Sequence, residues 1–490
     1  MSEKSAIKKV LLINPPAVVK PSRLEDLGAF PLGLAYIAAT LEAGGLEVEI
    51  LDCFIEGFDE QRAMENGLIR IGISDEAIIA AVARSAPDLA GVSIPFSCLL
   101  SSALHVNALI KKANPEIITA AGGAHVSAAP ESLEGGGFDH IIAGEGEYRL
   151  LNLIKTINSA EAGADDDVIN TASMNADSAL IHPHDFIENL DSLPFPAYHL
   201  LPLEKYWRAR GNRRWVNMIA TRGCPHNCVF CSIHNVMGKK VRYRSVENVL
   251  QEVLLLRRQF GVDEIFFEDD NLTLNMQWAK ELFVRIIREN LGLKIFFRNG
   301  IRADRVDMEL LGLMKKAGVR QVWFAPESGS QETLDRIIKK RMKLEDCEDA
   351  IRMAKSAGLE VACFLVIGFP EETLEDVRKT IQYGRRLKQL GCDYIWVSCA
   401  MPYPGTELFA QCLKKGIIRE DQIDYQSMAT TDAIIGNEWF SVEEIKRIRD
   451  QAMRELNRPG VKEIFKAVRR AAVLLFTDPL FLMKKIRTAW

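Results

Sequence analysis

The sequence predicts an α/β protein with an N-terminal doubly wound, Rossmann-like domain, a partial (β/α)6 barrel and a helical C-terminal appendage. Short β-branched runs alternate with helical periods, such as 32–43, in the first third of the chain. Six more such runs lie between residues 215 and 405, at 216–220, 264–267, 294–297, 321–325, 360–367 and 393–398. A chain of 490 residues also exceeds what one hydrophobic core usually holds. We therefore expect domains at 1–150 and 215–405, a linker at 151–214 that contains an acidic and polar insertion at 158–178, and the appendage at 406–490.

Composition and charge describe an ordinary folded chain. Hydrophobic residues make up 48% and charged residues 26%, and the formal net charge is −5. Because the chain has no basic block, nucleic acid is not an expected partner. No apolar run reaches the roughly 18 residues of a membrane span, and residues 1–9 lack the order of a signal peptide. With ten cysteines, too few for a disulfide scaffold, these features predict a cytoplasmic protein.

The first domain is expected to bind its ligand at the carboxyl ends of its strands, as doubly wound parallel sheets do. Its strand-like runs are 10–13, 47–51, 90–94 and 117–122. Taken singly, the residues at the ends of these runs are turn residues. The candidates for ligand binding among them are Pro15, Asp52, Phe54, Gly57, Ser93, Gly122 and Gly123.

Three cysteines with the spacing C-x-x-x-C-x-x-C follow the first strand-like run of the second domain. Cys224, Cys228 and Cys231 can offer three thiolates to a [4Fe–4S] cube, which normally takes four cysteines. One iron would stay open for a substrate or cosubstrate, as in catalytic metal sites. A zinc site completed by His226 or His234 and a set of unrelated buried thiols are the alternatives.

This spacing, with Phe230 directly before the last cysteine, resembles the motif of the radical S-adenosylmethionine (SAM) enzymes. The resemblance implies a [4Fe–4S] cluster whose open iron is chelated by the amino and carboxylate groups of SAM. It also implies SAM contacts at the strand ends of the barrel, with acidic groups facing the ammonium and sulfonium, Glu327 near the ribose or amino group and Gly368 near the adenine. Helix capping is the alternative for the carboxylates. The implied contacts are Asp269, Asp270, Arg298, Glu327 and Gly368.

The first domain shows a second resemblance. Residues 52–57, 93–95 and 122–123 are similar, in that order, to the D-x-H-x-x-G, S-x-L and G-G segments of cobalamin-binding domains. Phe54 stands where that pattern has the histidine that ligates cobalt, so the resemblance implies cobalamin without a histidine ligand from this loop. Glu145 lies in a segment that looks like the G-E-x-E loop of the same domains, where it can accept hydrogen bonds from a polar ligand. A Rossmann-like domain without a corrinoid is the alternative.

Together the resemblances cover about residues 8–410 and point to the cobalamin-binding radical SAM enzymes, often called class B radical SAM methylases. They imply that one SAM methylates cob(I)alamin and that another is cleaved to a 5′-deoxyadenosyl radical. Methylcobalamin would then methylate an unactivated carbon of a small-molecule or lipid-like substrate. An electron donor such as flavodoxin or ferredoxin is an expected partner.

Three other functions remain open at this point. The same architecture serves non-methylating reactions such as oxidative cyclisation or carbon–carbon bond formation. Methylthiotransferases share the cysteine loop but need three further N-terminal cysteines, and only Cys53 and Cys98 precede Cys224. A non-catalytic iron–sulfur or corrinoid sensor is the third.

The C-terminal appendage is expected to be helical. Residues 440–456 predict a helix with a capping box formed by Ser441 and Glu444. The basic amphipathic segment 461–476 and the apolar and basic segment 480–490 predict either a helix that packs over the barrel mouth or a weak membrane-surface contact.

Overall fold

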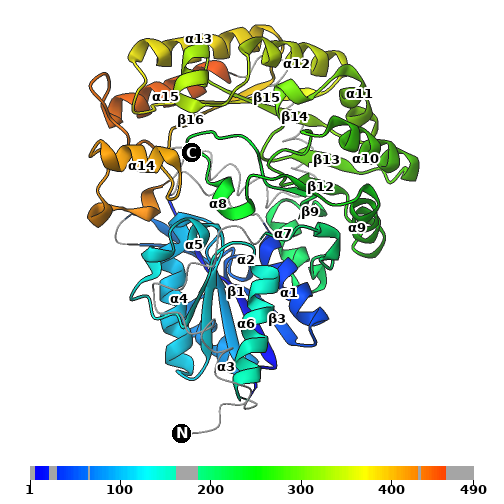
Figure 1. Cartoon of the computed structure of the whole chain (residues 1–490), viewed down its shortest axis with the longest axis vertical. Helices are drawn as coiled ribbons and strands as arrows, with labels where there is room; N and C mark the ends of the chain where they lie inside the picture. The colour runs from blue at the N-terminus through cyan, green and yellow to red at the C-terminus, as the bar shows by residue number, and fades with distance from the viewer. Residues whose placement is uncertain (1–5, 21–29, 65–66, 162–185, 429–431, 459–490) are drawn as a thin grey trace.

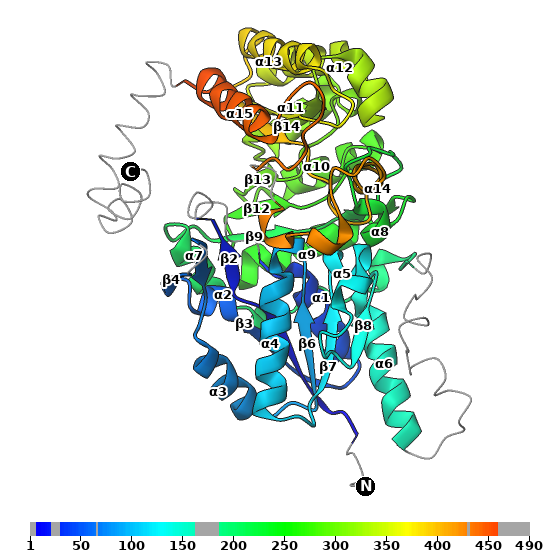
Figure 2. The same cartoon turned by 90° about the vertical axis from the view of Figure 1, so that its left-hand side faces the viewer.

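The computed structural model describes residues 6–20, 30–64, 67–161, 186–428 and 432–458. Figure 1 shows an N-terminal sheet between helices and, beside it along the long axis, an arc of strands with helices on its outer side. Between the two lie α5 (Ala124–Ala128) and α8 (Ile233–Met237), which contact each other and are also seen together in Figure 2. The predicted α/β fold, a doubly wound domain followed by a partial barrel, is confirmed.

The N-terminal sheet has five parallel strands in the order β3-β1-β6-β7-β8. These strands are β1 (Lys9–Asn14), β3 (Glu47–Asp52), β6 (Leu89–Ser93), β7 (Ile118–Gly122) and β8 (His140–Ile142). Its helices are α1 (Leu32–Ala43), α3 (Asp75–Ser85), α4 (Leu100–Ala113), α5 and α6 (Gly146–Glu161). The four predicted strand runs fall on the first four of these strands, because buried parallel strands are short and almost wholly apolar.

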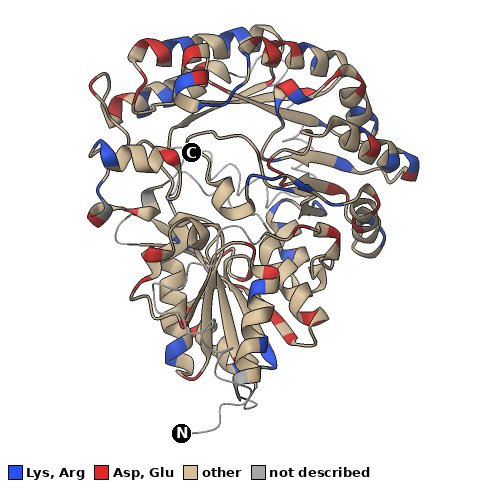
Figure 3. Cartoon of the chain, in the orientation of Figure 1, with Lys and Arg blue, Asp and Glu red and all other residues tan. Residues whose placement is uncertain are grey.

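Side chains of β1 alternate between the two faces of this sheet. Val10 and Leu12 belong to the core shared with α1 and α6, whereas Leu11 and Ile13 belong to the core shared with α3 and α4. Both faces are therefore covered. Figure 3 accordingly shows few charged residues on these strands and many on the helices and loops.

Helix α6 crosses residue 150, where the sequence analysis places the end of the first domain. Leu150, Leu151 and Ile154 of α6 pack in the same core as α1. The predicted polar insertion at 158–178 overlaps the last turn of α6, and its remainder lies outside the described residues. A small antiparallel sheet was not predicted. It consists of β2 (Ala17–Val19), β5 (Ile69–Ile71) and β4 (Gln61–Ala63).

The second domain has six parallel strands, three in the order β13-β12-β9 and three in the order β14-β15-β16. Parallel bridges from Ile295 to Val319 and from Ile301 to Phe324 join the two sets between β13 and β14. The strands are β9 (Trp215–Met218), β12 (Glu264–Phe267), β13 (Lys294–Phe297), β14 (Gln321–Glu327), β15 (Glu360–Ile367) and β16 (Tyr394–Cys399). The outer helices are α9 (Val246–Gln259), α10 (Met276–Glu289), α11 (Met308–Lys316), α12 (Leu344–Ser356) and α13 (Leu374–Gln389).

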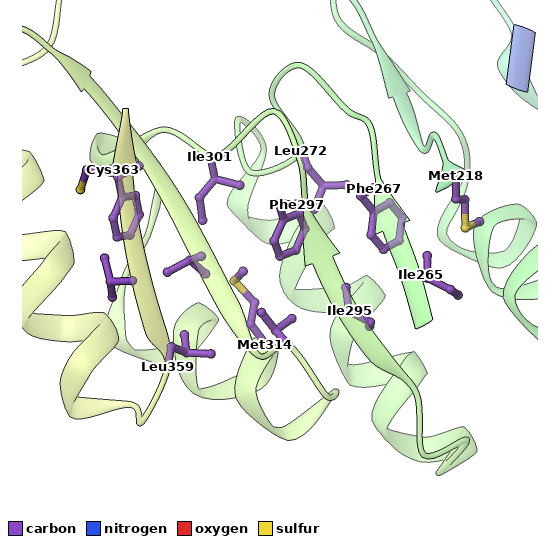
Figure 4. Close-up of a cluster of buried hydrophobic side chains, with 14 of the residues drawn as sticks. Met218, Ile265, Phe267, Leu272, Ile295, Phe297, Ile301, Met314, Leu359 and Cys363 are labelled. Carbon is purple, nitrogen blue, oxygen red and sulfur yellow. The ribbon is translucent and has the colours of Figure 1, made fainter. Parts of the chain in front are cut away.

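One side of this strand array packs against the helices. Ile265, Phe267, Ile295 and Phe297 form part of that core together with Met314 of α11, as Figure 4 shows. Because side chains alternate along a strand, their neighbours in sequence point to the inner side of the partial barrel.

The C-terminal helix α15 (Val442–Leu456) covers β16, the last strand of the array. Asn457 donates to the Ile395 carbonyl at 2.7 Å and accepts from the Ile395 N–H at 2.9 Å, which satisfies backbone groups of that strand. Ser441 caps the helix by accepting from the Glu444 N–H, one of the two bonds of the predicted capping box. Segments 461–476 and 480–490 lie outside the described residues. No helix in the described part of the chain is long and apolar enough to cross a bilayer.

Candidate cluster and cofactor site

The three cysteines of the motif lie on a loop closed by a short antiparallel stem. The stem pairs β10 (Thr221–Arg222) with β11 (Arg242–Tyr243). Gly223 begins the loop with φ +95°, and a Cβ there would lie 2.4 Å from the Lys240 carbonyl oxygen. Only glycine fits this turn without strain. The stem therefore fixes where the cysteine loop starts and ends.

Cys224, Cys228 and Cys231 are free thiols and half-buried. Burial raises the pKa of all three, that of Cys231 to about 12. In the metal-free protein these groups are protonated at neutral pH, so binding of metal releases protons.

The zinc alternative is not supported by a converging set of ligands among the described residues. The Nε2 of His234 lies 3.0 Å from the Cys224 carbonyl oxygen and is used there. Burial lowers the pKa of His226 to about 4, and its Nε2 has no hydrogen-bond partner within the described ranges. In those ranges no group of three His, Cys, Asp or Glu side chains converges on a single ion position. A cube places each cysteine on a separate iron and does not require such convergence.

The loop after β12 supplies acidic and amide groups next to the cysteines. Asp269 accepts from the Thr221 N–H at 2.6 Å, the Thr221 hydroxyl at 2.7 Å and the Ala220 N–H at 3.2 Å. It thus braces the entry to the cysteine loop and directs no free oxygen toward a ligand. Burial raises the pKa of Asp269 and of Asp270 to about 7. Asp270 is half-buried and interacts with the Gly223 N–H, so it has fewer partners within the protein than Asp269.

Asn271 belongs to the same predicted loop but was not among the candidate ligand contacts, and its side chain gives the clearest sign of a polar ligand. Its amide lies beside the Cys224 thiol. Both its oxygen and its nitrogen are buried, and neither makes a hydrogen bond of normal geometry with a described residue, although the Cys224 thiol lies close enough to interact with the amide. Buried polar groups in native proteins are almost always paired, so this amide fits a site that holds a polar cofactor.

Glu327 ends β14 in a left-handed backbone conformation, with φ +65°. Its carboxylate lies 2.6 Å from the Lys340 ammonium, and both side chains are 8% exposed. Strained residues continue nearby, because Lys339 and Arg341 also have positive φ angles. Lys339 and Arg341 follow a six-residue π-helix, Thr333–Ile338. The carbonyl of Ile338 accepts from the Val229 N–H of the cysteine loop at 3.1 Å. Clustered strain and π-helices are typical of functional sites.

A cavity of about 600 Å³ opens beside two of the three cysteines. It lies between the cysteine loop, the strained segment after the π-helix and the turn before α14 (Glu407–Lys414). Its lining residues are Asn227, Cys228, Cys231, His234, Asn235, Lys239, Asp335, Lys339, Arg341, Gly405 and Glu407. The cavity provides space beside the predicted cluster position. Its rim carries both basic and acidic side chains.

The end of β15 is shaped by packing and by a buried carboxylate. The ring of Phe230 lies 6.0 Å from that of Phe369. Gly368 has φ +89°, and a Cβ there would lie 2.9 Å from Ile445 Cγ1 of α15, so the close approach at this glycine is to a protein side chain. Glu372, which the sequence analysis did not single out, accepts from the Gly368 N–H at 2.7 Å and the Phe369 N–H at 3.0 Å.

In the first domain, Asp52 caps the short helix α2 (Cys53–Glu56). Its carboxylate accepts from the Ile55 N–H at 3.2 Å, from Asn14 Nδ2 at 2.9 Å and from the Tyr206 hydroxyl. Burial raises the pKa of Asp52. Asp52 is therefore fully engaged within the protein, and its hydrogen bonds fix the loop that carries Phe54.

Phe54 is 5% exposed, and its ring packs edge-on against Phe58 at 5.5 Å. The side chain at position 54 itself carries no metal-binding atom. Gly57, three residues later, is required by packing, because a Cβ there would lie 2.2 Å from the Ile73 nitrogen.

The remaining strand-end residues form an edge with small side chains. Pro15 is buried, and Ser93, Gly122 and Gly123 are half-buried. A Cβ at Gly122 would have its nearest neighbour at 3.5 Å, which leaves room above that strand. Phe96, a residue the sequence analysis missed, is 61% exposed three positions after β6. An uncharged edge with an exposed ring fits a large, largely apolar ligand such as a corrinoid.

Glu145 and Glu147 bind the stem of the cysteine loop. Glu145 lies 3.0 Å from an Arg222 nitrogen and 2.8 Å from an Arg242 nitrogen, and Glu147 lies 2.6 Å from Arg222. Glu145 also accepts from the Ile187 N–H at 2.6 Å. All four charged side chains are at most 5% exposed. The sequence analysis expected the Glu145 carboxylate to accept hydrogen bonds from a polar ligand. In the structure this carboxylate joins the first domain to the stem of the cysteine loop.

Comparisons with known proteins agree with this geometry. A family model described as B12 binding domain matches residues 28–154, and one described as Radical SAM superfamily matches residues 218–384. The chain is 33% identical to cytidylyl-2-hydroxyethylphosphonate methyltransferase of Streptomyces wedmorensis, over 92% of this chain and 90% of that protein. The chain belongs to the cobalamin-dependent radical SAM enzymes. Its cofactors are therefore a [4Fe–4S] cluster, SAM and cobalamin. Within this family the chain is a radical SAM methyltransferase.

Other relatives of this radical SAM enzyme agree in sequence or in fold. It is 32% identical to an uncharacterized methyltransferase of Pyrococcus horikoshii, over 91% of this chain and 92% of that one. Its fold is similar to that of TsrM from Kitasatospora setae, solved with cobalamin and a [4Fe–4S] cluster bound. In that comparison the TM-score is 0.65 and the identity 20%, over 84% of this chain and 78% of TsrM.

Proposed function

We propose that this enzyme transfers a methyl group to an unactivated carbon of a small-molecule or lipid-like substrate. The observation that carries the proposal is the loop of three free, half-buried thiols next to the unpaired amide of Asn271. This loop is joined to the cobalamin-binding domain by buried ion pairs. Relatives named as methyltransferases support methylation. A non-methylating reaction is the second candidate, because a cyclase of Rubrivivax gelatinosus is 27% identical over 78% of the chain.

In this proposal Cys224, Cys228 and Cys231 hold the cluster, and Asp270 and Asn271 face the amino end of SAM. Phe230, Arg298, Glu327 and Gly368 surround the same mouth of the barrel at the ends of β13, β14 and β15. When bound, the cluster and SAM supply the radical that removes a hydrogen atom, and cobalamin carries the methyl group. The chain contributes placement, exclusion of water and fixed charges.

The corrinoid would lie on the strand-end edge of the first domain, over Pro15, Ser93, Gly122 and Gly123, with Phe54 toward its lower face. We assign the reductant, a flavodoxin or ferredoxin, to the partly cationic rim of the 600 Å³ cavity, where Lys239 and Arg341 lie near two cysteines and Lys339 is paired with Glu407. Acidic carriers are attracted by such a rim through long-range electrostatics.

The test of this function is an anaerobic assay of reconstituted enzyme with dithionite, SAM, cobalamin and candidate substrates. Methyl transfer predicts S-adenosylhomocysteine, 5′-deoxyadenosine and methylated product in equal amounts. Formation of 5′-deoxyadenosine and product without S-adenosylhomocysteine would assign the non-methylating alternative. Absence of SAM cleavage under all conditions would instead favour a sensor.

Neutralising Asp270 is expected to weaken SAM binding by about 2 kcal/mol, because a charge-assisted hydrogen bond to the ammonium is lost. Equilibrium dialysis of SAM with anaerobic Asp270→Asn protein measures this, and the iron content should stay unchanged. Asp269→Asn is the matched control. It should lower the free energy of unfolding by about 1–3 kcal/mol, because Asp269 holds the backbone of the loop. Normal SAM affinity in both variants would leave these carboxylates with a purely structural role.

Cobalamin bound to this enzyme is expected to show no protein nitrogen on cobalt, because Phe54 occupies the position of the ligating histidine. Electron paramagnetic resonance of the Co(II) form should then lack nitrogen superhyperfine splitting. Phe54→His is expected to introduce such splitting where the imidazole reaches the metal, and Phe54→Leu serves as the apolar control. Clear nitrogen coupling in the unmodified protein would contradict the assignment.

A further inference from the structure

The inner side of the partial barrel carries a row of aromatic rings that faces away from the outer helices. One ring comes from each strand from β12 to β16, and all are half-buried. These rings, here called the aromatic wall, are Phe266, Phe296, Trp323, Phe364 and Trp396. Apolar rings that remain partly exposed on the inner side of a barrel are available for contact with a ligand.

The rings of the aromatic wall are stacked in pairs. The centroids of Phe266 and Phe296 lie 4.7 Å apart with an interplanar angle of 14°, and those of Trp323 and Phe364 lie 4.5 Å apart at 27°. Stacking turns one face of each ring toward its partner, so the ring edges and the outer faces of the pairs remain for contact with a ligand. Such an apolar surface favours an aromatic or other apolar group that can lie against it.

Arg210 and Arg298 bring two guanidinium groups to one end of the aromatic wall. Arg298 directly follows β13, and its Cζ lies 4.9 Å from the centroid of Phe266 and 5.4 Å from that of Trp215. Arg210 follows α7 (Leu203–Ala209) in the segment between the domains, and its Cζ lies 4.4 Å from the Trp215 centroid. Residues far apart in the sequence thus place two cations over the same indole ring.

Acidic groups balance this charge only in part. Glu268 Oε1 lies 3.4 Å from Arg298 Nε, and Glu264 is already paired with Lys294 at 2.8 Å. For Arg210 the described residues provide neither a side-chain hydrogen bond nor an ion pair. Burial, with Arg298 and Arg213 nearby, lowers the pKa of Arg210 to about 10.

Ring contacts do not replace hydrogen bonds for these guanidiniums. A cation over an aromatic ring gains electrostatic attraction, but the five N–H donors of arginine lie in the plane of the group and need acceptors. Two neighbouring, partly desolvated guanidiniums without enough acceptors therefore have the geometry and the charge to bind an oxyanion.

We propose that Arg210 and Arg298 bind a phosphate or phosphonate group of the substrate, with the planar or apolar remainder of that molecule against the aromatic wall. The inference rests on the proposed function, because it names the substrate class of that reaction. Arg298 lies at the carboxyl end of its strand, the end of a βα barrel at which catalytic groups gather and at which the cysteine loop also lies. The carboxylate of SAM has related chemistry, so the test must separate the two anions.

The test uses anaerobically reconstituted enzyme with cluster and cobalamin, and isothermal titration calorimetry with phenyl phosphate, phenol, inorganic phosphate and SAM as separate probes. Phenyl phosphate should bind more tightly than either of its fragments. Arg210→Gln and Arg298→Gln should each weaken phenyl phosphate binding by about tenfold or more. SAM affinity should change by less than about twofold in Arg210→Gln, because Arg210 is not one of the proposed SAM contacts. Arg298→Lys keeps the charge but loses the planar fork, and should fall between these values.

Arg449→Gln is the matched control. Its guanidinium also lies over a ring of the aromatic wall, 5.5 Å from the centroid of Trp396. Its donors, however, are already used by the Val397 carbonyl at 2.9 Å and by Asp450 at 2.8 Å. This variant should bind phenyl phosphate as the unmodified enzyme does, and an equal loss in all three glutamine variants would overturn the assignment to Arg210 and Arg298.

Two further outcomes would overturn the inference without touching the proposed methyl transfer. The first is an unmodified enzyme that cleaves SAM but does not bind phenyl phosphate. The second is a glutamine variant that loses SAM affinity and keeps phenyl phosphate affinity, which would assign the pair to the carboxylate of SAM. Absence of SAM cleavage in the unmodified enzyme would count against the proposed function alone, because phenyl phosphate binding is measured independently of turnover.

Discussion

Replacement of Cys224, Cys228 and Cys231 by alanine is expected to abolish the broad absorbance of the iron–sulfur cluster and the cleavage of SAM together. The three thiols are the only protein ligands proposed for the cube, and their loop is held at both ends by the β10–β11 stem. Without thiolates the irons have no anchor, so the variant should contain almost no iron after anaerobic reconstitution. Iron and sulfide analysis, the visible spectrum and chromatography of 5′-deoxyadenosine measure the effect.

Cys347→Ala is the control for this experiment. Cys347 is a fully buried free thiol on the outer helix α12, away from the motif. Its replacement should leave the cluster in place and change only the stability of the domain. Retention of about four irons per chain in the triple variant would contradict the cluster assignment.

Loss of the positive charge at Arg222 is expected to lower the free energy of unfolding by about 3–5 kcal/mol, because Glu145 and Glu147 would keep buried charges with fewer partners. Arg222→Met retains most of the volume and removes both ion pairs, at 3.0 and 2.6 Å. Since Arg222 directly precedes Gly223, the cysteine loop should also lose its fixed start. Denaturant unfolding of the apoprotein and the iron content after reconstitution report these two effects separately.

Two further variants sharpen this experiment. Arg258→Gln removes an exposed partner of Glu289, at 3.7 Å, and should cost less than about 1 kcal/mol. Arg222→Met combined with Glu145→Gln and Glu147→Gln removes the stranded charges and should recover part of the lost stability. No recovery in the triple variant would show that the arginine acts through packing alone.

The ion pairs also determine the direction of the pH dependence. Burial by itself would raise the pKa of Glu145, but Arg242 and Arg222 outweigh it and hold that pKa below its ordinary value. A carboxyl with a depressed pKa stabilises the folded state above its unfolded pKa, and this contribution is lost as the pH falls through the folded pKa. Joining of the first domain to the cysteine loop should therefore persist at neutral pH and weaken in acid.

Predictions from local patterns agreed closely with the structure. Helix α1 has the predicted bounds, Leu32–Ala43, and strands β12, β13 and β15 match the predicted runs. These elements are determined by hydrophobic periodicity within a single segment, which the sequence displays directly. Local patterns do not mark the position of a domain boundary in the same way: α6 crosses the predicted boundary at residue 150, and its apolar residues on both sides of that position lie in one helix.

The sequence did not predict the roles of residues whose partners lie far away along the chain. Glu145 is 77 residues from Arg222 and 97 from Arg242, so no short-range pattern in the sequence predicts their contact. Asp269 looks like a ligand-binding carboxylate in sequence, yet its oxygens accept from Ala220 and Thr221. The unpaired amide of Asn271 likewise becomes visible only when every neighbouring donor and acceptor is placed.

By itself the sequence determined the α/β class, the six barrel strands, the three-cysteine loop and the absence of a histidine at position 54, because each is a property of residue types at short spacing. The tertiary structure alone decided which carboxylates hold the chain together and which stay open to a ligand. It also placed Arg210 and Arg298 over Trp215. Burial and charge compensation belong to groups brought together from distant segments, and short-range patterns in the sequence do not record which segments meet.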